Sequence, residues 1–259
     1  MNEIGNIQTR QESCDQHGPF EAKSFTIMGR SMPWSKCPAC AAEESAREKA
    51  ADEAKAREAR LHAWQRKIGQ SGIPERFHDR TLDGFIARSE GQRSALAFAQ
   101  VYADEFDKVL RIGRSALFVG KPGTGKTHLA CGIGLQIMRE QNRTVLFSTV
   151  MRAIRRVKDS WGRDSRQTES QAIETLVAPD LLILDEVGVQ FGSDFERNIL
   201  FDVLNERYEK RRPTILMSNL AVSDVTGYLG ERIIDRIRED GGGLIVFDWE
   251  SHRAKGGAA

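Results

Sequence analysis

The segment GKPGTGKT, residues 120–127, has the residue types and the spacing of a phosphate-binding loop. Its glycines let backbone N–H groups approach an anion closely, and the helical stretch that follows directs its N-terminus to the same place. Lys126 would neutralise the β- and γ-phosphates of ATP or ADP, and the Thr127 hydroxyl would bind Mg²⁺. The expected nucleotide contacts are Gly120, Lys121, Pro122, Gly123, Thr124, Gly125, Lys126, Thr127 and His128.

Two acids end a second expected strand, LLILDE. Asp185 would hold Mg²⁺ directly or through water, and Glu186 would orient and deprotonate an attacking water. Asn219, at the end of a third strand, could fix the same water, although an asparagine in such a turn is otherwise ordinary. Together with the loop, these residues predict ATP hydrolysis.

Three cysteines and a histidine near the N-terminus form two close pairs. The spacing within each pair suits two ligands of the same tetrahedral Zn²⁺. The expected ligands are Cys14, His17, Cys37 and Cys40. A metal would supply folding free energy to a segment with little apolar mass. Free cysteines in a flexible tail are the alternative, and His62 or His78 could replace the histidine ligand. Cys131 is expected in the core.

The elements that must position these residues alternate between short apolar strands and helices. Strands are expected at residues 115–120, 144–150, 181–186, 214–219 and 244–249. Continuous apolar strands separated by helices predict an α/β fold, with a parallel sheet covered on both faces. A helix whose apolar stripe runs through Leu96, Phe98, Val101 and Phe106 is expected before the first of these strands.

Composition predicts three parts: an irregular zinc-binding module at 1–40, a charged helical linker at 41–68 and the α/β domain at 69–259. The linker is rich in alanine and pairs Glu43 with Arg47 at i,i+4 spacing; a coiled-coil arm is the alternative. The 38 basic and 37 acidic residues nearly cancel, so any nucleic-acid surface must be local. The absence of a long apolar run and of a signal-like start predicts a cytoplasmic protein.

Two helical stretches carry arginines whose partners are not evident from local sequence. Residues 151–166 present a basic face that could bind DNA phosphates beside Trp161, or could simply be solvated while Met151, Ile154, Val157 and Trp161 form a core stripe. The basic residues are Arg152, Arg155, Arg156, Lys158, Arg163 and Arg166. Residues 229–240 place Arg232 and Arg236 one turn apart, and taken alone this is a half-buried helix with a solvated face.

In this order, the motifs of residues 70–255 resemble those of an AAA+ ATPase and, more narrowly, of the DnaC-type replicative helicase loaders, phage versions included. The resemblance rests on GKPGTGKTHLA, LLILDEVGVQ, LMSNL, LGERIIDRIR and FDWESHR. It implies that Arg236 is an arginine finger delivered in trans to a neighbour's γ-phosphate, with Arg232 the second candidate, and hence a head-to-tail ring or spiral. It also implies that Arg253 senses the phosphates in cis, although the six residues that follow cannot build a separate lid domain.

The resemblance further implies that residues 1–68 dock on a hexameric, DnaB-type replicative helicase, and that Trp161, Ser193 and Phe195 line a channel for single-stranded DNA. Phe195 could instead be the first core residue of a helix. The function expected is ATP-dependent helicase loading. An IstB-type transposition ATPase is the main alternative, and a P-loop kinase is disfavoured because the acid beside Asp185 suits water activation.

Overall fold

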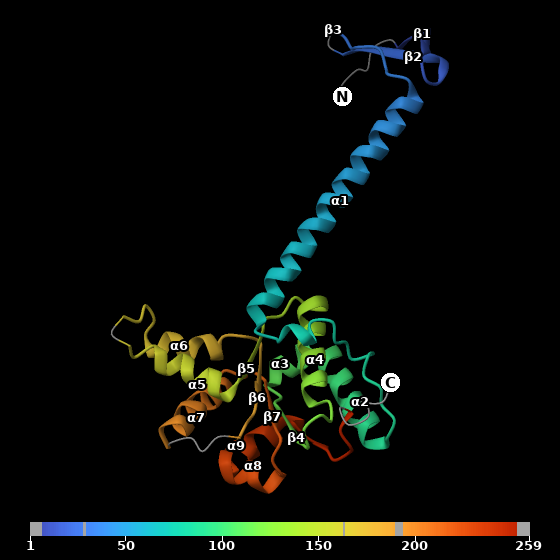
Figure 1. Ribbon diagram of the computed structural model, residues 1–259. Coiled ribbons are helices and arrows are strands. Elements are labelled where there is room, and N and C mark those ends of the chain that lie inside the picture. The colour runs from blue at the N-terminus through green and yellow to red at the C-terminus, as the bar shows by residue number, and fades with distance from the viewer. Residues whose placement is uncertain (1–6, 28–29, 163, 190–193, 253–259) are drawn as a thin grey trace. The chain divides into compact units, whose positions relative to one another are not determined.

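The computed structural model describes residues 7–27, 30–162, 164–189 and 194–252 (Figure 1). The chain divides into two compact units, Met1–Ala63 and Trp64–Ala259, each with a fold of its own. Among the described residues, no helix is both long and apolar enough to cross a membrane.

The N-terminal unit begins with an antiparallel β-hairpin, whereas the sequence predicts irregular structure for this part of the chain. Strands β1 (Ile7–Cys14) and β2 (Gly18–Ile27) pair along their whole length, and β3 (Arg30–Ser31) pairs with the end of β2. The expectation of irregular structure is wrong because most side chains of this hairpin are exposed, so no apolar alternation marks the strands. Ala22 and Ser24 are the buried exceptions on one face of β2.

Helix α1 (Pro38–Ser71) follows and crosses from the first unit into the second. Its alanines and interleaved charges favour a solvated helix, and residues 41–63 are exposed. Within the second unit the last two turns pack on the domain: Arg139 stacks on the Trp64 ring at 4.9 Å, and Lys67 Nζ donates to the Met138 carbonyl at 3.0 Å.

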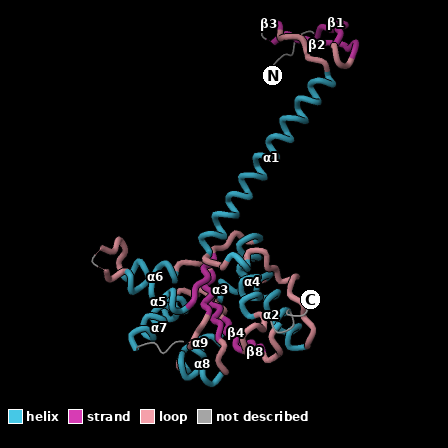
Figure 2. The backbone as a smooth tube through the Cα atoms, in the orientation of Figure 1, coloured by secondary structure: helices cyan, strands magenta, loops and turns pink. Residues whose placement is uncertain are grey.

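The second unit is built on a five-stranded parallel sheet of order β5-β6-β7-β4-β8. The strands are β4 (Ala116–Gly120), β5 (Val145–Thr149), β6 (Leu181–Asp185), β7 (Thr214–Ser218) and β8 (Gly243–Phe247). The five expected strands and the α/β fold are confirmed. Figure 2 shows the strands at the centre of this unit, with helices to either side.

Successive side chains of each strand enter two cores, one on each face of the sheet. Phe118, Ile183 and Ile215 pack with one helical layer, whereas Leu117 and Leu182 pack with the other. The first layer contains α2 (Glu90–Asp104), α3 (Phe106–Ile112) and α4 (Lys126–Glu140). The second contains α5 (Val150–Asp159), α6 (Glu169–Val177), α7 (Asp194–Glu209), α8 (Val222–Leu229) and α9 (Glu231–Arg238). Short 3-10 turns complete the unit at η1 (Glu75–Phe77) and η2 (Glu239–Gly241).

The helical stripe expected between residues 96 and 106 needs one correction. The Val101 side chain is 51% exposed, and the buried positions of α2 are Gln92, Ala95, Ala99, Tyr102 and Ala103. The helix also ends before Phe106, which begins α3 and is fully buried there. Of the expected stripe, Leu96 and Phe98 are partly buried against this core, whereas Val101 lies outside it.

A buried arginine ties α6 to β7. Arg207 of α7 has no exposed surface, and its guanidinium donates to four backbone carbonyls and to the Thr214 hydroxyl. The carbonyls belong to Leu176, Val177, Pro179 and Pro213. Buried carbonyls need donors, so this one side chain satisfies the end of α6 and the entry to β7 together.

Replacing Arg207 with methionine is expected to lower the free energy of unfolding by about 3 kcal/mol, because the buried carbonyls lose their donors. Lys210→Met is the matched control, since Lys210 makes only exposed ion pairs with Glu174 and Glu206 and should cost at most about 1 kcal/mol. Urea unfolding followed by circular dichroism measures both. Equal losses for the two variants would contradict the stabilising role of Arg207.

Candidate functional site

A cleft of about 380 Å³ opens at the carboxyl ends of β4, β6 and β7. This is the edge of a parallel sheet where ligands bind, and the volume lies within the usual range for small-molecule sites. The lining residues are Arg76, Phe77, Arg80, Pro122, Gly123, Gly125, Lys126, Thr127, His128, Asp185, Glu186, Asn219 and His252. The structure therefore brings most of the expected nucleotide residues together.

The phosphate loop wraps around the ammonium group of Lys126. Lys126 is only 6% exposed, and its Nζ donates to the carbonyls of Gly120 and Lys121 at 2.7 and 2.9 Å. Gly125 lies at φ 100°, and a Cβ there would stand 2.6 Å from the Phe85 ring. A side chain at this position would be excluded both by backbone strain and by space. Helix α4 begins at Lys126, so its N-terminus opens into the loop.

The C-terminal segment holds the loop from one side. The Trp249 indole N–H donates to the Thr124 carbonyl at 2.9 Å, and the backbone N–H of His252 donates to the Gly123 carbonyl at the same distance. Thr124 also closes the loop internally, since its hydroxyl donates to the Lys121 carbonyl at 2.8 Å. These bonds fix the loop backbone in shape, as an anion site requires.

His128 fastens the other side of the loop to the segment before α2. Burial lowers the pKa of His128, so its imidazole is neutral at pH 7. Its Nε2 therefore carries the proton that is donated to the Thr81 carbonyl at 2.9 Å. Phe85 packs edge-on against the same ring at 5.5 Å. His128 thus helps to position the loop through its ring contacts.

Thr127 and Asp185 form an oxygen pair suited to magnesium. The Thr127 hydroxyl donates to Asp185 Oδ2 at 3.2 Å, while Oδ1 accepts the backbone N–H of Glu186 at 2.8 Å. A hydroxyl and a carboxylate that converge on one point beside a phosphate loop are the hard oxygen ligands that Mg²⁺ takes, together with phosphate and water. The residues present therefore fit the ion.

Glu186 and Asn219 flank this pair on adjacent strand ends. Glu186 has φ 64°, an unusual left-handed conformation for a residue other than glycine, and such strain is concentrated at functional sites. Asn219 follows β7, the strand beside β6, and lines the cleft. Both residues therefore line the same cleft as the phosphate loop.

Four residues that line the cleft were not expected from sequence: Arg76, Phe77, Arg80 and His252. The first three belong to the connector between α1 and α2, where Arg76 lies over the Phe77 ring at 5.2 Å. The two arginines add positive charge to a site for a polyanion. Their signal in the sequence is only a pair of basic residues in a Gly/Pro-punctuated segment, far from the loop.

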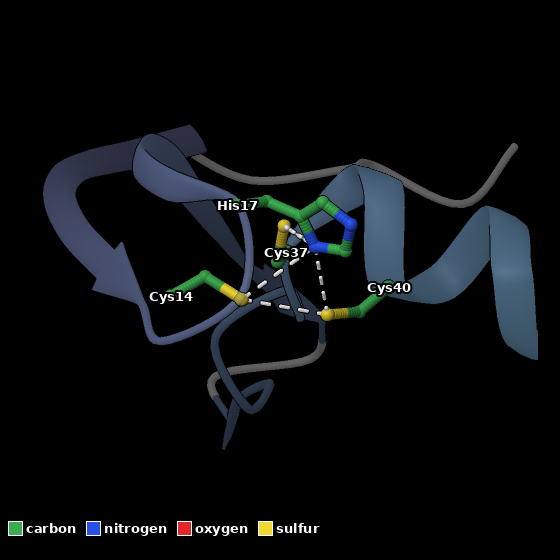
Figure 3. A group of neighbouring side chains, drawn as sticks. All are labelled: Cys14, His17, Cys37 and Cys40. Carbon is green, nitrogen blue, oxygen red and sulfur yellow. Dashed lines mark hydrogen bonds between the residues drawn. The ribbon is translucent and has the colours of Figure 1, made fainter.

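The four expected zinc ligands converge in the N-terminal unit (Figure 3). Cys14 and His17 lie at the turn between β1 and β2, while Cys37 and Cys40 lie at the start of α1. Their donor atoms all fall within 4.8 Å of one another. His17 Nδ1 is 3.8, 3.9 and 3.3 Å from the sulfurs of Cys14, Cys37 and Cys40, and the sulfurs of Cys14 and Cys40 are 3.4 Å apart.

These separations suit zinc. Tetrahedral Zn²⁺ places two sulfurs about 3.8 Å apart and a sulfur and a nitrogen about 3.6 Å apart. The backbone at Gln16 and then the His17 side chain lower the pKa of the Cys14 thiol to about 6, whereas the bond to Cys14 raises the pKa of the Cys40 thiol to about 11, so of these two thiols Cys14 ionises first. Among the described residues, His17 is the histidine whose donor atom joins the three cysteines. His62 lies beside Glu58 on exposed α1, and His78 Nε2 donates to the Ile73 carbonyl.

The basic face of α5 surrounds a surface cleft of about 410 Å³. Arg152, Arg155, Arg156 and Arg166 line it. Lys158 points to Glu196 instead, with Nζ and Oε1 2.6 Å apart.

The expected core stripe of α5 also needs a correction. Ile154 and Val157 are buried, but Trp161 lies beyond the helix, is 44% exposed, and donates its indole N–H to Glu169. Ser193 and Arg253 lie outside the described residues, and so does the side chain of Phe195.

The two candidate finger arginines differ in their surroundings. The stripe of Ile233, Ile234 and Ile237 packs α9 onto the domain. Arg232 is exposed, whereas the half-buried Arg236 binds the Asn205 side-chain oxygen and lies over the Tyr208 ring at 4.3 Å, both on α7 of the same chain. The described geometry thus shows Arg236 in contact with its own subunit.

The comparisons with known proteins agree with this architecture. The family described as IstB-like ATP binding protein matches residues 110–246. The replicative helicase loader DnaC of Escherichia coli (strain K12) is 35% identical over 199 residues, which cover 77% of this chain and 79% of that protein. The loader DnaC of Buchnera aphidicola subsp. Acyrthosiphon pisum (strain APS) is 34% identical over 197 residues, 76% of this chain and 78% of that protein.

A crystal structure of the DnaC helicase loader superimposes with a TM-score of 0.60 at 25% identity. The match covers 67% of this chain and 99% of that chain. The parallel sheet flanked by helices is therefore that of a shared ATP-binding fold. The chain belongs to the DnaC family of replicative helicase loaders, within the IstB-like AAA+ ATP-binding proteins.

Proposed function

We propose that this protein uses ATP to load a hexameric replicative helicase onto single-stranded DNA, with nucleotide binding promoting assembly and hydrolysis promoting release. The observation that carries the proposal is a formed nucleotide cleft in a chain whose relatives are replicative helicase loaders. Both the phosphate loop and the oxygen pair of Thr127 and Asp185 support a switch that depends on Mg²⁺ and ATP.

Within the cleft, the roles follow from the chemistry of each side chain. Lys126 exchanges its two carbonyl acceptors for β- and γ-phosphate oxygens when the nucleotide enters. Thr127 and Asp185 hold Mg²⁺, which neutralises phosphate charge. Glu186 accepts a proton from the attacking water, and Asn219 orients that water. Arg253, outside the described residues, contacts the phosphates of the same subunit.

The N-terminal unit is the part proposed to dock on the helicase, which is of the DnaB type. A zinc ion held by Cys14, His17, Cys37 and Cys40 would fix the hairpin β1–β2 to the start of α1. Both elements belong to this unit and have few buried side chains, so the metal would contribute much of their folding free energy. Residues 1–40 would dock on the helicase, and residues 69–259 would bind ATP. Residues 41–68 would link these two parts.

The DNA contact is proposed at the basic cleft on α5. Its arginines, Arg152, Arg155 and Arg156, would hold phosphates, and the exposed ring of Trp161 would stack on a base. Lys158 is paired with Glu196 and contributes only if that pair opens. Ser193 and Phe195 extend the proposed DNA path.

The second candidate function is that of an IstB-type transposition ATPase, which selects target DNA for a transposase. The description of the matching family, IstB-like ATP binding protein, favours it. The covered length and identity of the DnaC relatives favour the loader.

Capture of a hexameric replicative helicase, together with the ATPase rate, tests the proposal. Immobilised protein with ATP and Mg²⁺ is expected to retain the hexamer, and single-stranded DNA is expected to change the rate of hydrolysis. A truncated chain of residues 64–259, with the compact second unit intact, is the matched control and should lose the helicase. Failure to retain the hexamer, with hydrolysis driven instead by duplex DNA, would favour the transposition ATPase.

A further inference from the structure

His17 is held from both sides of its imidazole ring. On one side Nδ1 faces the sulfurs of Cys14, Cys37 and Cys40. On the other side Nε2 lies 3.1 Å from Oε1 of Glu43, a residue of α1 that follows His17 by 26 residues in the sequence. The ring therefore bridges the three thiol groups and a carboxylate.

The chemistry of Glu43 decides which ring nitrogen can bind a metal. A carboxylate only accepts hydrogen bonds, so Nε2 must carry the proton of this pair. In a neutral imidazole the lone pair is then on Nδ1, which is the atom that faces the three sulfurs. Metal-binding histidines commonly donate their other N–H to a carboxylate or carbonyl, which orients the ring and raises the basicity of the ligand.

Helix geometry explains why Glu43 is available for this contact. Glu43 follows Cys40 by three residues, and side chains at i and i+3 lie on the same face of a helix. The neighbouring Glu44 points elsewhere and pairs with Lys36 at 2.8 Å. Two adjacent acids on one helix turn thus have separate partners, and only the first contacts His17.

We infer that Glu43 is the positioning residue of the N-terminal metal site: it fixes the tautomer of His17 so that Nδ1 coordinates zinc, an inference that rests on the zinc site of the proposed function. The Glu43 side chain is 52% exposed, so water competes for its carboxylate and its effect lies at the lower end of the range for such partners. Loss of this contact weakens zinc binding by about tenfold.

Zinc affinity of the full-length chain tests the inference, measured by competition with a chromophoric chelator. Glu43→Ala is expected to weaken binding about tenfold, whereas Glu43→Gln, whose amide oxygen still accepts the Nε2 proton, stays within about threefold of the parent chain. Glu44→Ala is the matched control, because it removes the same charge from the same helix turn but leaves His17 in contact with Glu43.

A direct readout accompanies the affinities. Long-range ¹H–¹⁵N spectra of the zinc-loaded protein are expected to show His17 with metal at Nδ1 and a proton at Nε2. Metal at Nε2 would overturn the inference, and so would an alanine variant that binds as tightly as Glu44→Ala or a glutamine variant as weak as Glu43→Ala. A parent chain that binds no zinc overturns the metal site as well, while helicase capture and ATP hydrolysis would still test the loader function separately.

Discussion

Replacing Lys126 with alanine is expected to weaken ATP binding by roughly a hundredfold, or about 3 kcal/mol. The ammonium group is the central cation of the loop, and in this structure it already lies inside the loop backbone on the Gly120 and Lys121 carbonyls. A phosphate that enters this site gains charge-assisted bonds to that ammonium, in a position with little access to water. Without it, the backbone N–H groups of the loop remain, but the loop has lost its buried cation.

Titration with a fluorescent ATP analogue measures this loss. Lys108→Ala is the control: Lys108 is an exposed lysine of α3 that pairs with Glu105 and does not line the cleft, so its change should alter the affinity by less than about threefold. Because Lys126 also bonds the loop internally, thermal unfolding of both variants without nucleotide shows whether the domain remains intact. An intact Lys126→Ala chain with unchanged ATP affinity would refute the phosphate-loop assignment.

The sheet could be predicted from sequence because both of its faces are buried. Strands such as β6, Leu181–Asp185, are apolar at successive positions, so their signal is local and strong. The hairpin β1–β2 has the opposite character: most of its side chains are exposed, and the buried positions of β2 include Ala22 and Ser24, which carry no strong apolar signal. The same locality explains why the loop could be found: residues 120–127 carry its entire pattern.

The parts that could not be predicted depend on contacts between distant residues. Glu43 is spaced to pair with Arg47, yet the structure places it against His17. Arg76 and Arg80 reach the cleft only because the connector packs beside the phosphate loop. Nothing in local spacing distinguishes these partners from ordinary solvated charges, since surface charges pair in many ways at small cost.

The contacts of Arg236 are a third example of contacts between residues that are distant in the sequence. They also determine how the arginine finger has to be tested. Asn205 lies on α7, 31 residues earlier, and holds the guanidinium together with the Tyr208 ring. These contacts orient Arg236 on the surface of α9, beside the exposed Arg232. For Arg236 to act in trans, a neighbouring subunit must bring its nucleotide to this face, so its effect should appear only in the assembled state.

Arg236→Ala is expected to leave ATP affinity within about threefold and to lower hydrolysis in assemblies by about 10³-fold or more, since a finger supplied to the γ-phosphate is worth about 10³ to 10⁵ in rate. Arg232→Ala is the matched control on the same helix and should retain most of the activity. Thermal unfolding of each variant accounts for the packing that Arg236 loses with Tyr208.

Mixing two inactive variants distinguishes action in trans from action in cis. A Lys126→Ala subunit binds ATP about a hundredfold more weakly but still carries Arg236, whereas an Arg236→Ala subunit binds ATP but lacks the finger. Mixed assemblies are expected to regain hydrolysis, because the first subunit can supply its arginine to the nucleotide of the second. If mixing restores nothing, Arg236 does not act across the interface. Normal hydrolysis by Arg236→Ala alone, with loss in Arg232→Ala, would assign the finger to Arg232 instead.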